Sequence, residues 1–120
     1  MFDPRVYRYV YRLGISPKHK GFGYICDVVT ALLESGAADA GLDEAICAAC
    51  SKHGTGRRSA ERCIRYAVQY AWDAEQSGLR RELGLGAVRG GQYERPPALR
   101  EVIVMAVCEL TETCDNNRVV

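Results

Sequence analysis

The sequence lacks any apolar run that approaches the ~20 residues of a membrane-spanning helix. Its first ten residues, MFDPRVYRYV, also lack the apolar core of a secretory signal peptide. These absences exclude a membrane protein and predict a cytoplasmic location, where the six cysteines stay reduced. Because no internal repeat and no linker interrupts the 120 residues, we expect one domain over residues 1–120, long enough to bury a core.

The chain has little net charge, only +1, which by itself does not indicate a nucleic-acid partner. The charges are unevenly distributed. Residues 1–20 hold five Lys or Arg and one acid, residues 21–51 hold five acids and no base, and residues 52–66 hold five bases and one acid. Because phosphate binding depends on the local field, two basic blocks separated by an acidic one predict a polarised surface.

Candidates for catalysis or metal binding are few. His19 has no nucleophile or carboxylate at a suggestive spacing, so we expect no enzyme activity and no cofactor. Cys47, Cys50 and His53 invite a zinc interpretation, but Cys47 and His53 lie on different sides of one helix, and a structural zinc site needs four ligands. Cys50 falls on a core-facing stripe and Cys63 on the edge of another, which suits small buried apolar side chains. We therefore predict no metal site.

The spacing of apolar residues predicts an all-α fold, a compact bundle of about six helices. The first helix is capped by Asp3, has Pro4 at its first position, and reaches Leu13 before Gly14 ends it. The last opens at Pro97 and ends near Thr113, and the tail beyond it is expected to fray. Between them, further elements are expected at Phe22–Ser35, Leu42–His53, Thr55 to about Gln76 and Leu79–Leu83, followed by an irregular loop over 84–97.

Two consecutive helices carry the strongest functional pattern. The first follows Gly41, places Asp43 and Glu44 at its positive end, and ends at Gly54, where glycine permits a left-handed turn. Thr55 is then expected to cap a longer basic helix. A helix, a short glycine-containing turn and a basic helix form a helix-turn-helix in that order, although any pair of antiparallel helices resembles it. The apolar stripes are Leu42, Ala45, Ile46, Ala49 and Cys50 in the first helix, and Ala60, Cys63, Ile64, Ala67, Val68 and Ala71 in the second.

The polar side of the second helix carries Arg58, Glu61, Arg62 and Arg65 near its start. Guanidinium groups in this position suit guanine edges in the major groove, so these four residues are the candidates for base contacts. The alternative is an ordinary solvated face. Two aromatic residues further along, Tyr70 and Trp72, are expected to pack in the core or against a partner. A similar face in the first helix, with Arg5, Arg8 and Arg12, is either solvated or a second backbone contact.

Two stretches match a known family. LGISPKHKGFGYI, residues 13–25, and AERCIRYAVQYAW, residues 60–72, resemble the C-terminal DNA-binding effector domain of the stage zero sporulation protein A family, and the last helix matches it more loosely. The similarity covers roughly residues 6 to 112. It implies that Glu61, Arg62 and Arg65 line the major groove, and that the loop of Lys18, His19 and Lys20 holds the phosphate backbone.

The family also implies a six-helix fold, a short asymmetric DNA box often present in tandem copies, and contact with the sigma subunit of RNA polymerase. Its full-length members begin with a phospho-receiver domain, and nothing in this sequence resembles one. The turn departs from the family at Arg57 and Arg58, where small or hydroxyl residues are usual. This difference predicts a changed operator preference and stronger nonspecific binding, with Thr55 and Arg57 among the backbone contacts.

The sequence therefore predicts a sequence-specific regulator of transcription that binds double-stranded DNA, with a homodimer on tandem boxes and the sigma subunit as expected partners. The alternative, from another class, is an all-helical protein-interaction module that keeps the fold without an operator. A positive face that joins Lys20 to Arg62 would favour DNA, and an exposed apolar patch would favour a protein partner.

Overall fold

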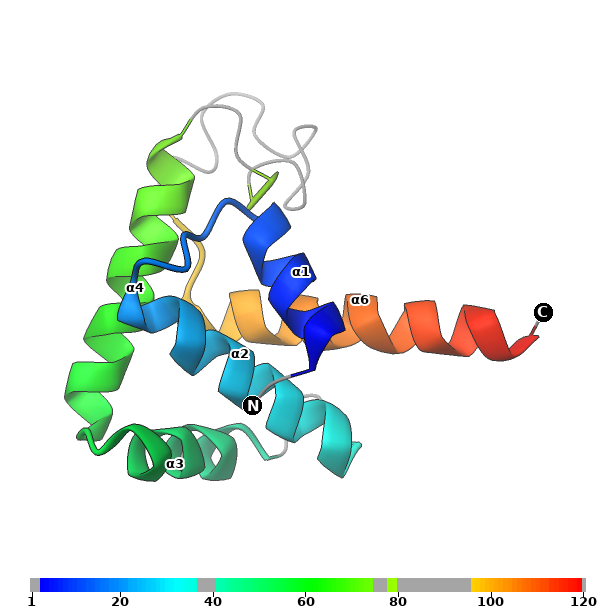
Figure 1. Cartoon of the computed structure of the whole chain (residues 1–120), viewed down its shortest axis with the longest axis horizontal. Helices are drawn as coiled ribbons and strands as arrows, with labels where there is room; N and C mark the ends of the chain where they lie inside the picture. The colour runs from blue at the N-terminus through cyan, green and yellow to red at the C-terminus, as the bar shows by residue number, and fades with distance from the viewer. Residues whose placement is uncertain (1–2, 37–40, 75–77, 80–95, 120) are drawn as a thin grey trace.

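The computed structural model of the protein describes residues 3–36, 41–74, 78–79 and 96–119, with side chains of the last helix described as far as Thr111. These residues form five α-helices and no strand, which confirms the all-α prediction. Of the predicted short helix over Leu79–Leu83 only Leu79 is described, and most of the loop over 84–97 lies outside the described residues. The helices in Figure 1 are α1 (Pro4–Arg12), α2 (Lys20–Ser35), α3 (Leu42–His53), α4 (Arg57–Asp73) and α6 (Leu99–Val119).

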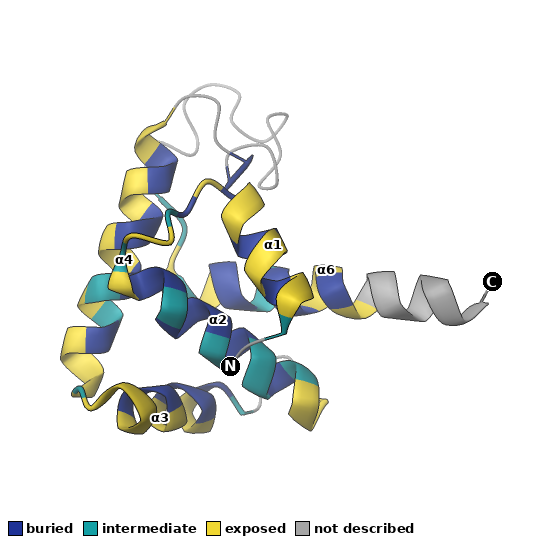
Figure 2. Cartoon of the chain, viewed as in Figure 1, coloured by how far each residue is buried: buried dark blue, intermediate teal, exposed yellow. Residues whose placement is uncertain are grey.

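The helix α2 is the centre of the fold, because it packs against each of the other four helices. Figure 1 shows α3 and α4 meeting at a corner on one side of α2, while the C-terminal part of α6 projects away from the other helices. The buried faces in Figure 2 turn toward α2, and the exposed faces of α1, α3 and α4 turn outward. The acidic middle segment thus supplies the core helix, and the start of this helix, at Gly21, contacts α4 at Cys63.

The ends of α1 agree with the sequence. Asp3 is the N-cap, its carboxylate accepts a hydrogen bond from the Arg5 amide at 2.8 Å, and Pro4 opens the helix. At the C-terminal end of α1, the Leu79 amide donates a hydrogen bond to the Leu13 carbonyl at 2.9 Å. Its neighbour Gly78 lies so close that a Cβ there would stand 1.8 Å from the Arg12 carbonyl oxygen.

The bounds of α2 and α6 differ from the predicted ones, as does the start of α4. The helix α2 begins at Lys20 rather than Phe22, because a first helical turn needs no apolar residue to form. The helix α6 begins at Leu99 rather than Pro97, since the Glu101 carboxylate accepts from the Ala98 amide at 2.8 Å and caps the helix there. It also continues past Thr113 to Val119, through a stretch without glycine or proline to end it.

The predicted capping role of Thr55 is wrong. The N-cap of α4 is Gly56, and no side chain caps this end of the helix. The Thr55 amide instead donates to the Cys50 carbonyl at 3.0 Å, closing the end of α3 around Gly54, whose φ of 63° is left-handed. Thr55 therefore belongs to the end of the preceding helix, and α4 starts two residues later.

The predicted apolar stripes of α3 and α4 are confirmed. Every named member is buried except Cys63, which is partly buried at the edge of the core. Trp72 is also buried, as expected, with 2% of its surface exposed. Tyr70 is not in the core, because 57% of its surface is exposed. On a helix, position 70 lies about 160° from position 72, so the two aromatic rings leave α4 on different sides.

Candidate nucleic-acid interface

The exposed side of α4 carries a row of three arginines. Arg58, Arg62 and Arg65 are exposed, and with Gln69 they lie within about 60° of one another on a helix of 3.6 residues per turn. Within the described part of the chain, no carboxylate forms an ion pair with any of the three arginines. We call these four residues the arginine stripe. Among the described residues, no carboxylate occupies the donors of these guanidinium groups.

The C-terminal part of the arginine stripe borders α6. Arg65 and Gln69 line a cleft of about 270 Å³ together with Pro97 and Glu101. The Glu101 carboxylate is already bonded to the Ala98 amide, so it is held at the start of α6. Arg65 consequently lies where the surface of α4 meets that of α6, whereas Arg58 lies in the first turn of α4.

Arg57 is not available in the same way. Its Nη2 lies 2.8 Å from Asp43 Oδ1 and its Nε lies 3.1 Å from Glu61 Oε2, so it bridges the starts of α3 and α4. Hydrogen bonding to these carboxylates raises the pKa of Arg57, and the Arg57 guanidinium lowers the pKa of Asp43. The bond to Glu61 joins two residues four positions apart on the same side of α4. Glu61 itself is half-buried rather than exposed.

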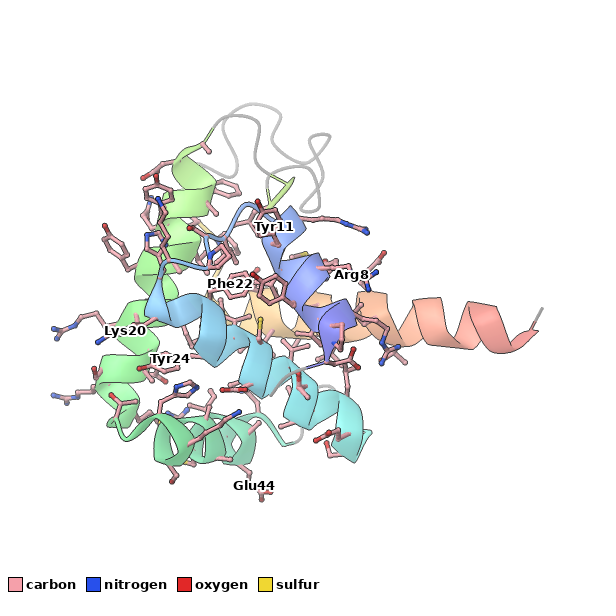
Figure 3. All side chains as sticks on the ribbon, viewed as in Figure 1. Arg8, Tyr11, Lys20, Phe22, Tyr24 and Glu44 are labelled. Carbon is pink, nitrogen blue, oxygen red and sulfur yellow. The ribbon has the colours of Figure 1, made fainter. Side chains whose placement is uncertain are left out.

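The loop before α2 brings the other basic block to α4. Lys18 and Lys20 are exposed, and neither forms an ion pair within the described residues. Figure 3 shows Lys20 at the start of α2, where this helix meets α4. The two backbones approach so closely that a Cβ on Gly21 would stand 2.3 Å from the Cys63 carbonyl oxygen. Lys20 precedes Gly21 in the sequence, and Arg62 precedes Cys63. The contact between Gly21 and Cys63 therefore brings the two basic blocks together.

His19 packs on α4 rather than standing free in the loop. Its ring lies edge-on to Tyr66 and Tyr70, with ring centroids 5.2 Å and 4.9 Å away. Its Nδ1 is buried and has no hydrogen-bond partner in the part of the chain that the structure describes. The sequence singled out His19 as a phosphate contact and gave Tyr66 no role. The signal that could have found Tyr66 is its spacing of four from Tyr70, beside the arginine stripe.

A second polar cluster, which the sequence did not predict, holds the end of α3 against α2. Asp27 on α2 has a side chain only 9% exposed, and its carboxylate lies 3.1 Å from Lys52 Nζ and 2.5 Å from His53 Nε2. The hydrogen bond to Asp27 raises the pKa of Lys52. The His53 ring also lies edge-on to Tyr24 at 4.6 Å. Lys52 and His53 therefore hold the end of α3 against α2.

Other kinds of site are not evident in the residues that the structure describes. These residues include no group of three or more His, Cys, Asp or Glu side chains placed to hold a metal ion. Burial raises the pKa of the Cys26 thiol to about 12, so this cysteine stays protonated at neutral pH. None of the described helices combines the length and the apolar character needed to cross a membrane.

No protein-family model, no curated protein and no solved structure matches this chain.

Proposed function

We propose that this protein regulates transcription by sequence-specific binding to double-stranded DNA, with α4 in the major groove. The observation that carries the proposal is the arginine stripe. Among the described residues, three exposed arginines without a carboxylate ion pair project from the second helix of an α3–turn–α4 unit, beside two exposed lysines that form no ion pair there either. Exposed cations normally pair with nearby acids or disperse over a surface. Five cations on adjoining elements, none of them in an ion pair with a described residue, match a polyanionic ligand.

The structure suggests a division of roles along this surface. Arg58, Arg62 and Arg65 are assigned to base edges, because a guanidinium can donate two parallel hydrogen bonds to guanine. Glu61 can accept from cytosine, and it also orients Arg57. Phosphate contacts, which position the helix on the duplex, are assigned to Lys18 and Lys20. Thr55 and Arg57, at the turn before α4, are assigned to the same role.

Membership of the stage zero sporulation protein A effector family remains part of this proposal. It is supported by the matched stretches at residues 13–25 and 60–72, which the structure places against each other through Gly21 and Cys63. From the same resemblance we propose binding as a homodimer to tandem boxes, contact with the sigma subunit of RNA polymerase, and action in the cytoplasm.

The test is selection of binding sites from a randomised duplex pool, followed by affinity measurements on the selected box and on random duplex. Arg65→Ala should weaken binding to the selected box by about 1–3 kcal/mol and relax its specificity, because a bidentate base contact is lost. Arg8→Ala is the matched control, since Arg8 is an exposed arginine on α1, outside the proposed interface (Figure 3). If Arg65→Ala loses the same affinity for the selected box and for random duplex, Arg65 contacts a phosphate and not a base.

The second candidate function is a protein-interaction module. It is favoured by four exposed tyrosines, which are amphipathic and common in protein interfaces; they are Tyr7, Tyr11, Tyr66 and Tyr70. If the folded parent protein enriches no sequence from the pool and binds no duplex at low salt, this function replaces the first.

A further inference from the structure

Two large exposed side chains beside the arginine stripe have no role in the function proposed above. Tyr66 is 62% exposed and Tyr70 is 57% exposed, although tyrosine side chains in a chain of this size are usually better covered. They are four residues apart, so they lie one above the other on the same side of α4. Relative to Arg62 they lie about 40° and 80° around the helix, toward the loop that carries Lys18 and Lys20.

The two rings are held in place by His19. The histidine ring lies edge-on to both tyrosines, at 5.2 Å from Tyr66 and 4.9 Å from Tyr70. Edge-to-face aromatic contacts at these distances favour one orientation of the rings over free rotation. Because the rings are restrained before any ligand arrives, less conformational entropy is lost when they bind one.

His19 does nothing else that the described residues reveal. It is the N-cap of α2, yet its side chain makes no capping hydrogen bond. Its Nδ1 is buried and without a partner, which costs free energy unless the position of the ring is useful. The ring instead packs edge-on against the two tyrosines.

A helix in the major groove has bases along the side that faces the floor and sugar–phosphate walls on either flank. With Arg58, Arg62 and Arg65 toward the floor, the side of α4 that carries Tyr66 and Tyr70 faces one wall. His19 packs on Tyr66 and Tyr70, and it stands between Lys18 and Lys20 in the sequence. These two exposed lysines therefore lie next to the same side of α4. Tyrosine suits such a wall, because its hydroxyl can donate to a phosphate oxygen while its ring covers a deoxyribose.

We propose that Tyr66 and Tyr70 bind the DNA backbone through their hydroxyl groups, and that His19 is the positioning residue that holds them. This assignment rests on the proposed function. With this assignment, the hydroxyl groups of Tyr66 and Tyr70 are neutral hydrogen-bond donors on α4, next to the charged donors of Lys18 and Lys20. Neutral contacts strengthen binding without releasing counterions, so their contribution to the affinity does not depend on salt concentration.

The experiment measures the affinity for the selected box at several salt concentrations. Tyr66→Phe and Tyr70→Phe each remove one hydroxyl, and each should weaken binding by roughly 2- to 12-fold, the range for a lost neutral hydrogen bond. The slope of log affinity against log salt should stay that of the parent. Lys20→Ala should lower the magnitude of this slope by about one. Tyr11→Phe is the matched control, because Tyr11 is 59% exposed on α1 (Figure 3) and should bind as the parent does.

His19 is tested by two substitutions. His19→Phe keeps an aromatic ring against Tyr66 and Tyr70 and should retain the parent's affinity and salt slope. His19→Ala leaves both tyrosines without support and should lose affinity, again with an unchanged slope. If His19→Phe loses as much affinity as His19→Ala and lowers the slope, His19 is a phosphate contact and its positioning role is overturned.

The failures of the two proposals differ. Binding by Tyr66→Phe and Tyr70→Phe equal to that of the parent overturns the tyrosine assignment alone. A folded parent that binds no duplex overturns the proposed function and this assignment with it. Thermal melting of each variant checks the fold, and the phenylalanine variants are expected to melt like the parent because both hydroxyls belong to exposed side chains.

Discussion

Replacing Gly21 with alanine would add one methyl group at the place where α2 comes closest to α4. The new Cβ would stand 2.3 Å from the Cys63 carbonyl oxygen, 2.8 Å from its carbonyl carbon and 2.9 Å from the Ile64 Cα. Non-bonded carbon atoms prefer separations of about 3.5–4.0 Å, so the two helices would have to separate by roughly 1 Å. All three neighbours are backbone atoms of a helix, and none can rotate away.

The expected cost follows from two opposing effects. Overpacking of a well-packed core costs about 1–3 kcal/mol, and contact with backbone on both sides places Gly21→Ala at the upper end of that range. Alanine favours a helix over glycine by about 1 kcal/mol, which offsets part of the cost. We therefore expect the variant to lose about 2 kcal/mol of unfolding free energy, or roughly 8 °C in melting temperature for a chain of this size.

The neighbouring glycine provides the control. A Cβ on Gly23 would have only one neighbour within 4 Å, His53 Cε1 at 3.9 Å, which is an ordinary contact. Gly23→Ala gains the same helix propensity without a clash, so it should be as stable as the parent or up to about 1 kcal/mol more stable. Both positions are in the first turns of α2, and they differ chiefly in the space around the added methyl group.

Thermal and denaturant unfolding of Gly21→Ala and Gly23→Ala measures both predicted changes in stability. A Gly21→Ala variant that melts at or above the temperature of the parent would refute the close approach of α2 to α4. Equal losses in both variants would attribute the effect to alanine in α2 rather than to this contact. Well below its melting temperature, Gly21→Ala should also bind DNA more weakly, because the displaced start of α2 carries Lys20 and His19 away from α4.

Three other predictions concern the α3–turn–α4 unit. Ile64→Ala should lower the unfolding free energy by about 2–5 kcal/mol in denaturant titrations, because Ile64 is 1% exposed and its removal leaves a cavity; a loss below 1 kcal/mol would contradict its core position. Glu61→Ala should change stability by less than about 1 kcal/mol but change the bases selected from a randomised pool, because it frees Arg57 from one of its two partners; unchanged selection would remove Glu61 from the interface. The Arg57 guanidinium lowers the pKa of Asp43 from its ordinary 3.8, so this pair stabilises the fold above that pH and the stabilisation disappears as the pH falls through the lowered pKa. Asp43→Asn should therefore flatten the loss of stability measured between about pH 5 and pH 2, and an unaltered pH profile would show that the pair does not contribute.

Much of the fold follows from the sequence because the signals are local. Apolar residues repeat every three or four positions in α3 and α4, and this spacing alone identifies the buried side of each helix. Asp3 followed by Pro4 specifies the start of α1, and Gly54 specifies the turn after α3, since each acts within a few residues of itself. Thr55 shows the limit of such signals: its hydroxyl suits a cap, but its amide is needed to close the preceding helix.

The candidate interface follows only partly from the sequence. Its pattern placed Arg58, Arg62 and Arg65 on one side of a helix, because helical geometry depends on spacing and not on neighbours. Which of the basic residues are free depends on carboxylates far away in the chain. Arg57 is occupied by Asp43, 14 residues earlier, and Lys52 is occupied by Asp27, 25 residues earlier.

The role of His19 shows the same dependence. A histidine between two lysines in a loop has the composition of a phosphate site, and nothing local contradicts that interpretation. The close contact of Gly21 with the backbone of α4 brings the loop against this helix, where the ring of His19 packs on Tyr66. Spacing along one helix can be read from the sequence, whereas contacts between α2 and α4 depend on how two helices pack, and only the tertiary structure determines that packing.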